Sequence, residues 1–476
     1  MNLLFVASEV APFCKTGGLG DVAGALPQAL AASGVQVSVV MPLYETISEE
    51  WRNKMDFVRQ LNVQLSWRNQ PCGIFSLEKD GITYYFLENA YYFNRRELYG
   101  HYDDGERFAF FSKAVLDMLP AIGCFPDVIH ANDWQTALIP IYLRLMYAYD
   151  PRYARIKTVF TIHNIQYQGN FPRGFLTDVT GIDDVHYRSG LLAFDDGINL
   201  VKGAVCCADS LTTVSPSYAG EILTPYYAHG LDAILRDNRQ KLSGVVNGID
   251  VDAYNPATDP RIAENYSPAD PSGKAICKQS LQHMLGLREE HDTPIIAIIT
   301  RLAEHKGLDL IGAVLDDIMT ENVQLVVLGR GEWRYEQLFD QARRRYPGRV
   351  SVNILFSEDL AHQIYAGADI LLMPSKSEPC GLAQMIAMRY GTLPLVRETG
   401  GLKDTVHAYN PADGSGNGFS FANFNAHDML YTVRHAVQCY QDEELWNTLA
   451  LRGMSADLSW KRSAADYIAV YEKTLV

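Results

Sequence analysis

Short apolar runs alternate with amphipathic stretches along almost the whole chain. The first run, Leu3–Ala7, is followed by an amphipathic stretch over Asp21–Ala32 and then by a second run, Val35–Met41. Short buried strands joined by helices are typical of parallel sheets with helices on both faces. The sequence therefore predicts a doubly wound α/β fold.

The alternation occurs in two series, which predicts two such domains. In the first series, further strands are expected at Ile82–Leu87, Val128–His130, Thr158–Ile162, Leu211–Val214 and Gly244–Val246, and helices near 106–119, 134–148 and 191–207. In the second, strands are expected at Ile295–Thr300, Leu325–Leu328, Val350–Ile354, Ile370–Met373 and Leu393–Val396. In such proteins ligands bind at the carboxyl ends of the strands, facing the cleft between the domains.

A stretch with little periodicity separates the two series. Residues 250–271 are rich in Asp, Pro, Asn and Ala, as a hinge or linker is. We therefore expect an N-terminal domain over residues 1–245 and a C-terminal domain over residues 246–458. The amphipathic stretch at 459–476 is expected to form a helix that completes the N-terminal domain.

The charge and the cysteines restrict partners and location. Lys and Arg number 41 against 56 Asp and Glu, a net charge of −15, which disfavours general binding to nucleic acids or anionic membranes. The eight cysteines form no CxxC pair and no metal-ligand spacing, which favours reduced thiols. The N-terminus lacks a basic leader, and no apolar run approaches a membrane span. We expect a soluble cytoplasmic protein.

A glycine-rich loop, Lys15-Thr16-Gly17-Gly18-Leu19-Gly20-Asp21, follows the first strand. Glycines before a helix let backbone N–H groups approach an anion, and Lys15 would add a full charge. The alternative is a flexible loop with a solvated lysine. The loop also resembles a dinucleotide fingerprint, but its spacing has one residue too many, and the next strand ends in Met41-Pro42 without an acid for a ribose.

Charged residues follow two strands of the second series. Arg301 and Lys306 come after one strand, where two cations suit a pyrophosphate, although a loop salt bridge is the alternative. Glu378 comes after another strand. It is placed either to contact a substrate or to stabilise the N-terminus of the following helix. Thr399-Gly400-Gly401 resembles a further anion-receiving loop. Asp250-Val251-Asp252 has the spacing of a metal-binding DxD, but a solvated turn is the favoured interpretation.

Polar residues also follow strands of the first series. His163 is a candidate general base, although a single histidine at a strand end is more often a positioning group. Asp133 is either a functional carboxylate or a cap for the following helix. Asn247-Gly248 is expected to form a turn at the end of a later strand.

The order of these motifs resembles that of the bacterial glycogen synthases, relatives of the plant starch synthases. The resemblance rests on KTGGL, HANDW, TIHNIQYQG, VVNGID, TRLAEHKG, EPCGL and the Thr-Gly-Gly run, and it spans essentially the whole chain. It implies the GT-B fold, with two Rossmann-like domains facing a deep cleft. It also implies transfer of glucose from a nucleotide sugar to the non-reducing end of an α-1,4-glucan such as glycogen, with retention. ADP-glucose is the donor of bacterial relatives and UDP-glucose that of other branches, and no cofactor or metal is implied.

The resemblance also implies roles for individual residues. The expected catalytic set is Glu378, Arg301, Lys306, Asp133 and His163. The expected substrate-binding set is Lys15, Gly18, Asn164, Asn247, Phe356, Cys380, Gly381, Leu382, Thr399 and Gly400. Of these, Lys15, Arg301 and Lys306 correspond to the family's diphosphate-binding cations, and Phe356 to an aromatic near the base. The family uses the segment of Asn89, Tyr91, Tyr92 and Tyr99 towards the acceptor.

Two positions depart from relatives. Ile386 stands where many retaining enzymes of this fold have a second Glu, and His305 stands where relatives often have Gln. Two other function classes compete with a glucosyltransferase. A Rossmann oxidoreductase is disfavoured by the misplaced glycines. A silent glucan-binding protein would not need Lys15, Arg301, Lys306 and Glu378 together.

Overall fold

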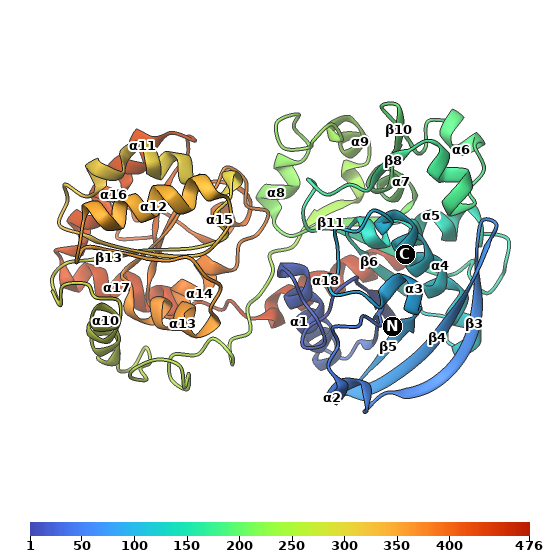
Figure 1. Ribbon diagram of the computed structural model, residues 1–476, viewed down its shortest axis with the longest axis horizontal. Helices are drawn as coiled ribbons and strands as arrows, with labels where there is room; N and C mark the ends of the chain where they lie inside the picture. Colours follow the sequence, from blue (N-terminus) through green and yellow to red (C-terminus); the bar gives the residue numbers. More distant parts are fainter. The chain divides into compact units, whose positions relative to one another are not determined.

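The computed structural model describes residues 1–476 and divides into two compact units, each built around its own sheet (Figure 1). The N unit comprises Met1–Asn247 and Trp460–Val476, and the C unit comprises Gly248–Ser459. The last helix, α18 (Trp460–Leu475), packs against α1 (Gly18–Ala32) within the N unit. No helix of the chain is both long and apolar enough to cross a membrane.

The N unit contains a nine-stranded sheet in the order β12-β11-β7-β6-β1-β2-β5-β4-β3. All pairs from β12 to β5 are parallel, as the sequence predicts. Their bounds are β1 (Asn2–Val6), β2 (Gln36–Pro42), β5 (Ile82–Glu88), β6 (Val128–Asn132), β7 (Lys157–Ile162), β11 (Ser210–Thr213) and β12 (Leu242–Gly244). The antiparallel hairpin of β3 (Asp56–Leu65) and β4 (Arg68–Lys79) extends this sheet.

The helices α1, α4 (Asp104–Ile122), α5 (Leu138–Leu145) and α7 (Leu200–Cys207) accompany this sheet. The expected helix at 191–207 is wrong in its first half. Asp195 adopts φ +48° in a turn between β9 (Ala193–Phe194) and β10 (Gly197–Asn199), so a small hairpin forms there. The helix begins only after Asn199, whose side chain accepts a hydrogen bond from the Lys202 N–H at 2.8 Å.

The C unit is a six-stranded, fully parallel sheet in the order β15-β14-β13-β16-β17-β18. The strands are β13 (Ile295–Ile299), β14 (Gln324–Leu328), β15 (Val350–Asn353), β16 (Ile370–Met373), β17 (Leu393–Arg397) and β18 (Phe419–Phe421). The helices are α10 (Gly273–Met284), α11 (Leu308–Ile318), α12 (Trp333–Arg345), α13 (Glu358–Gly367), α14 (Ala383–Arg389), α15 (Gly400–Thr405), α16 (Ala426–Tyr440) and α17 (Glu443–Met454). The predicted α/β class with two parallel sheets is confirmed.

Residues 250–271, expected to be a loose linker, are in part packed onto the C unit. Asp259 is 2% exposed, and its Oδ2 lies 2.6 Å from both His362 Nδ1 and the Tyr390 hydroxyl. The buried Tyr266 hydroxyl donates to the Tyr390 carbonyl at 2.8 Å. The weak periodicity of this segment therefore reflects irregular but anchored backbone.

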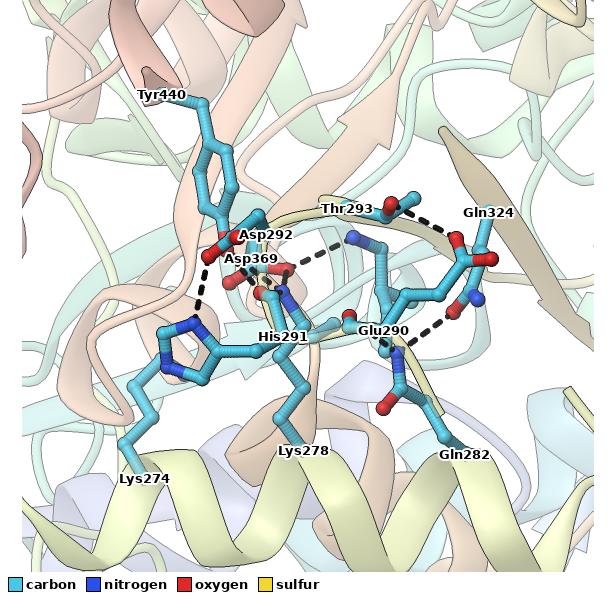
Figure 2. A network of polar contacts seen from close by, with 12 residues as sticks. Lys274, Lys278, Gln282, Glu290, His291, Asp292, Thr293, Gln324, Asp369 and Tyr440 are labelled. Carbon is cyan, nitrogen blue, oxygen red and sulfur yellow. Dashed lines mark hydrogen bonds and ion pairs between the residues drawn. The ribbon is translucent and has the colours of Figure 1, made fainter. Parts of the chain in front are cut away.

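A buried charge pair anchors α10 to the C-unit sheet (Figure 2). It lies at the edge of the sheet opposite the carboxyl ends of the strands. Lys278 Nζ lies 2.9 Å from Asp369 Oδ2 and donates to the Tyr440 hydroxyl at 2.6 Å. Asp369 directly precedes β16 and also accepts from the Ile295 N–H that opens β13. Because each charge has a partner and further hydrogen bonds, this cluster is structural rather than a ligand site.

Candidate functional site

An ion pair lies beyond the carboxyl ends of β13 and β16. Lys306 Nζ lies 2.6 Å from Glu378 Oε2, and the Ser375 hydroxyl donates to the same oxygen at 3.0 Å. The side chain of Lys306 is 19% exposed and that of Glu378 is 10% exposed. A carboxylate so nearly buried is stable as an anion only with such partners. The two residues that the sequence predicts to bind substrate are therefore brought together.

A glycine fixes the approach of these two loops. Gly307 adopts φ +71°, and a Cβ at this position would lie 1.9 Å from the Pro374 carbonyl oxygen. The Lys376 N–H donates to the His305 carbonyl at 2.8 Å, which ties the loops together beside Gly307. Only glycine adopts this conformation in so tight a space, so the turn places Lys306 against Glu378.

Further positive charge surrounds Lys306. Arg301 is exposed and forms no ion pair within the chain. Burial lowers the pKa of His305, and the nearby charges of Lys306 and Arg301 lower it further. The site thus holds a free guanidinium and an ammonium close to a neutral imidazole, an arrangement suited to an anion.

The turn after β17 lies against the backbone of Glu378. Gly400 adopts φ +45°, and a Cβ there would lie 2.1 Å from the Glu378 carbonyl oxygen. The Gly401 N–H donates to the same oxygen at 3.2 Å, and Thr399 is fully buried. The structure thus brings the predicted residues Thr399 and Gly400 beside the Glu378 loop.

The remaining predicted residues of the C unit differ in exposure. Cys380 is buried, and Gly381 adopts φ +73° just before α14, with Leu382 between them and the helix. Phe356, by contrast, is 79% exposed in the loop before α13. An aromatic side chain this exposed is free to stack on a ligand, but no residue of the chain holds it in place.

In the N unit, Asp133 and His163 meet at the carboxyl ends of β6 and β7. Asp133 adopts φ +59°, and its Oδ1 accepts from the His163 N–H at 2.8 Å. The alternative role of helix cap is wrong, because its side chain bonds the neighbouring strand end instead. Burial, and to a smaller extent the negative charge of Glu9, raise the pKa of Asp133 to about 7, although the N–H groups of His163 and Asn164 oppose the rise.

Hydrogen bonds determine the tautomer of His163. Its Nε2 lies 2.9 Å from Asn132 Oδ1, and Asn132 Nδ2 donates to the Val6 carbonyl at 3.0 Å. Since the amide oxygen can only accept, His163 Nε2 carries the proton. Burial lowers the pKa of His163 to about 3, so the ring is neutral at physiological pH. The geometry therefore favours the positioning role over the general base.

The glycine-rich loop leads directly into α1, which begins at Gly18, three residues before the expected start. Lys15 Nζ lies 3.0 Å from Asp21 Oδ1, and both side chains are more than two-fifths exposed. An exposed pair of this kind is weak, so a competing anion can displace Asp21. Lys15 lines a hollow of about 570 Å³, whose lining is Phe13, Cys14, Lys15, Thr16, Thr46, Arg96, Glu97, Leu98 and Tyr99.

Other predicted residues of the N unit have mixed roles. Asn247 is 6% exposed, and its Oδ1 is buried without a hydrogen-bond partner, as expected for a group that binds a ligand. Asn164 Oδ1 accepts from the Gln166 N–H at 3.0 Å. Asn89 and Tyr92 in the segment expected near the acceptor are structural, since Asn89 donates to the Pro71 carbonyl and Tyr92 to Glu106.

The DxD motif shapes a turn. Asp250 Oδ1 accepts from the N–H groups of Asp252 and Ala253 at 3.0 and 2.9 Å. No group of three or more His, Cys, Asp or Glu side chains is arranged to hold a metal ion.

Sequence reasoning missed two residues of the site, Ser375 and Glu9. The Ser375 hydroxyl donates to Glu378 Oε2, which Lys306 also contacts. Glu9 is a buried acid beneath the glycine-rich loop. The signal for Glu9 was its position, three residues after a buried strand and before the glycine-rich loop.

Comparisons with known proteins cover nearly the whole chain. The starch synthase catalytic domain family matches residues 2–237, and the glycosyl transferases group 1 family matches residues 284–448. The glycogen synthase of Geobacillus thermodenitrificans is 52% identical over all of this chain and 98% of its own length. That of Bacillus cereus is 49% identical over the full length of both.

Solved structures agree with these matches. The catalytic domain of starch synthase IV from Arabidopsis thaliana, bound to ADP and acarbose, has a TM-score of 0.91 at 33% identity over 99% of both chains. A sucrose-phosphate synthase from Thermosynechococcus elongatus has a TM-score of 0.62 at 15% identity, over 99% of this chain and 98% of its own, and shares the fold alone. The chain thus has the two-domain α/β architecture of the GT-B fold.

Proposed function

Because the chain belongs to the glycogen synthase family of glycosyltransferases, we propose that it transfers glucose from ADP-glucose to the non-reducing end of an α-1,4-glucan, with retention of configuration. The full-length relatives named glycogen synthase and the ADP held by the plant starch synthase support this reaction. The nucleotide sugar and the glucan are its only proposed partners, with neither nucleic acid nor membrane. The eight free cysteines suit the reducing cytoplasm, where we place it.

The observation that supports this function best is the cluster of Arg301, Lys306 and Glu378 at one sheet edge. Breaking the bond between the sugar C1 and the phosphate oxygen leaves negative charge on the diphosphate. A fixed cation aimed at that charge lowers the barrier by about 3 kcal/mol. Arg301 and Lys306 are the proposed cations, and they supply the charge that a divalent metal would otherwise give.

The glucose is held, in this proposal, by polar groups of both units. Glu378, held in place by Lys306 and Ser375, accepts hydrogen bonds from sugar hydroxyls. The backbone N–H groups of Cys380, Gly381 and Leu382 donate to others. From the N unit, Asn247 supplies its unpartnered oxygen, and neutral His163 offers Nδ1 as an acceptor.

The diphosphate is proposed to engage both units. Lys15 and the Gly18 N–H belong to the N unit, whereas Arg301 and Lys306 belong to the C unit, as do Thr399 and Gly400. In this proposal one diphosphate contacts both sets, so the units close around it when it binds. Closure would exclude water and strengthen each electrostatic contact.

We favour a same-face mechanism for the retention of configuration. Retention by double displacement needs a carboxylate nucleophile at C1. Glu378 is the candidate carboxylate of the C-unit site, but its Oε2 is already engaged by Lys306 and Ser375. In the proposed step, the C1–phosphate oxygen bond breaks and the acceptor hydroxyl oxygen bonds C1 on the same face. The hydroxyl proton passes to the departing phosphate oxygen.

The direct experiment supplies ADP-glucose and a maltooligosaccharide primer to the purified chain. Longer oligosaccharides should form, and NMR of the products should show new α-1,4 linkages. A chain that hydrolyses the donor or leaves the primer unchanged would contradict the proposal. Glu378→Gln serves as the matched inactive control, since it preserves the shape of the side chain.

A further inference from the structure

Glu9 lies directly beneath the glycine-rich loop. It follows β1 and is only 3% exposed. The Thr16 hydroxyl donates to Glu9 Oε2 at 2.9 Å, and the Thr16 N–H donates to the same oxygen. The Gly20 N–H donates instead to the Gly17 carbonyl at 3.2 Å, a bond within the same turn. Two donors of one loop residue, Thr16, therefore converge on a single buried acid.

This arrangement decides which loop groups remain for a ligand. The N–H and hydroxyl groups of Thr16 face inward, to Glu9. The Gly18 N–H donates to no group of the chain, and a Cβ at Gly18 would meet nothing within 4 Å. The loop thus has an inner face that an internal anion occupies and an outer face left for another anion.

The loop is wound tightly enough for Glu9 to control Lys15. A Cβ at Gly20 would lie 2.5 Å from Lys15 Cβ and 3.6 Å from Glu9 Cδ. The backbone of Lys15 is therefore held between the start of α1 and the buried carboxylate. Because the next residue, Thr16, bonds Glu9, we expect a change in these bonds to shift the base of the Lys15 side chain.

We propose that Glu9 is a positioning residue for the diphosphate: its carboxylate holds the inner face of the loop so that Lys15 and the Gly18 N–H point outward to the ligand. The inference rests on the proposed function for the identity of that ligand. The structural part of the inference, that Glu9 holds the loop in place, applies to any anion bound at the outer face of the loop.

The role requires a carboxylate rather than an amide. Glutamine has one oxygen acceptor, and its NH₂ group would face loop N–H donors. Burial raises the pKa of Glu9, while the loop N–H groups oppose that rise. Cys14 of its own loop and Tyr44, Tyr99 and Asp133 of neighbouring segments also interact with Glu9. The Thr16 donors bond its carboxylate directly.

The first test measures amide hydrogen exchange in the ligand-free full chain. Glu9→Gln should raise the exchange rate of the Thr16 amide at least tenfold and leave the amides of β1 and β2 protected. Glu50→Gln, an exposed acid of the same unit, is the control and should change none of them. Unchanged exchange at the loop in Glu9→Gln would overturn the inference. If Glu9→Gln does not fold, Glu9→Asp replaces it in the experiment. Its carboxylate is one methylene shorter and so lies farther from the loop donors, and the same result is expected.

The second test is a double-mutant cycle for binding of ADP. Glu9→Gln should weaken binding about tenfold in the wild-type background, as expected for lost hydrogen bonds to a charged group. In a Lys15→Ala background the same change should cost less than threefold, because the residue it positions is gone. Equal losses in both backgrounds would mean a general structural role and overturn the inference. If the wild type itself does not bind ADP, the proposed function fails, while hydrogen exchange still tests Glu9.

Discussion

Lys306 Nζ lies 2.6 Å from Glu378 Oε2, so the cation proposed for the diphosphate and the acid proposed for the sugar neutralise each other in the ligand-free chain. The pair keeps both side chains in place without substrate. A diphosphate that arrives beside Lys306 must share it with Glu378. Binding and turnover should therefore respond differently when either partner changes.

Neutralising Glu378 should separate these two effects. Glu378→Gln leaves Lys306 without a competing anion, so the affinity for ADP should stay unchanged or rise. The turnover number should fall by about a hundredfold or more, because the sugar loses its charged acceptor. Calorimetry with ADP and initial rates with ADP-glucose measure the two effects. Glu304→Gln, an exposed acid of the preceding turn, is the control.

The same residue tests the same-face mechanism. Mass spectrometry of the wild type with a slow donor should show no glucosyl adduct on Glu378. A covalent adduct there would replace the proposed mechanism with double displacement.

Arg301 and Lys306 should make the reaction independent of divalent metal. Activity should persist in EDTA, and adding magnesium should not increase it. Arg301→Ala should lower turnover by about a hundredfold, comparable to the loss of one fixed donor in an oxyanion site. Arg344→Ala, an exposed arginine on α12, should remain active. Loss of activity in EDTA that magnesium restores would contradict this prediction.

Asp133 should make folding stability depend on pH. Burial raises its pKa from 3.8 to about 7, so between these values the folded chain holds a proton that the unfolded chain has released. The free energy of unfolding must then fall as the pH rises through this window. Asp133→Asn removes the ionisation and retains a residue that tolerates positive φ.

Thermal denaturation can measure this effect. Relative to the wild type, Asp133→Asn should be about 2–3 kcal/mol more stable at pH 8 than it is at pH 5. Asp237→Asn, an exposed aspartate of the same unit, should show no such dependence. An equal difference at both pH values would show that Asp133 has an ordinary pKa.

The two units should close on the donor. Small-angle scattering should show a smaller radius of gyration with saturating ADP-glucose or ADP than without it. Lys15→Ala should reduce that change and weaken binding, whereas Lys54→Ala, another exposed lysine of the N unit, should not. An unchanged profile at saturation, with full activity of Lys15→Ala, would mean that Lys15 is a solvated loop residue.

The parallel strands were predictable because each is a short apolar run with a clear end. The predicted run Ile370–Met373 is β16 itself, and Leu3–Ala7 overlaps β1 closely. The hairpin β3–β4 was missed because the first half of β3 is exposed, so no continuous buried run marks the strand. The β9–β10 hairpin was missed because its turn at Asp195 interrupts what otherwise resembles one helical stretch.

The site was predictable where strand ends bear charge and glycine. Arg301, Lys306 and Glu378 stand out for this reason, and their proximity follows from adjacent strands of one sheet. The tautomer and low pKa of His163 were not predictable, because they depend on Asn132 and on burial. Glu9 and Ser375 were missed because a single acid or hydroxyl gains meaning only from the donors that fold around it.

The most direct measurement compares initial rates of maltooligosaccharide elongation with ADP-glucose and with UDP-glucose at equal concentration. We expect chain extension with ADP-glucose, without added metal, and much slower extension with UDP-glucose. Extension with UDP-glucose alone would contradict the proposed donor, and no extension with either would contradict the proposed reaction.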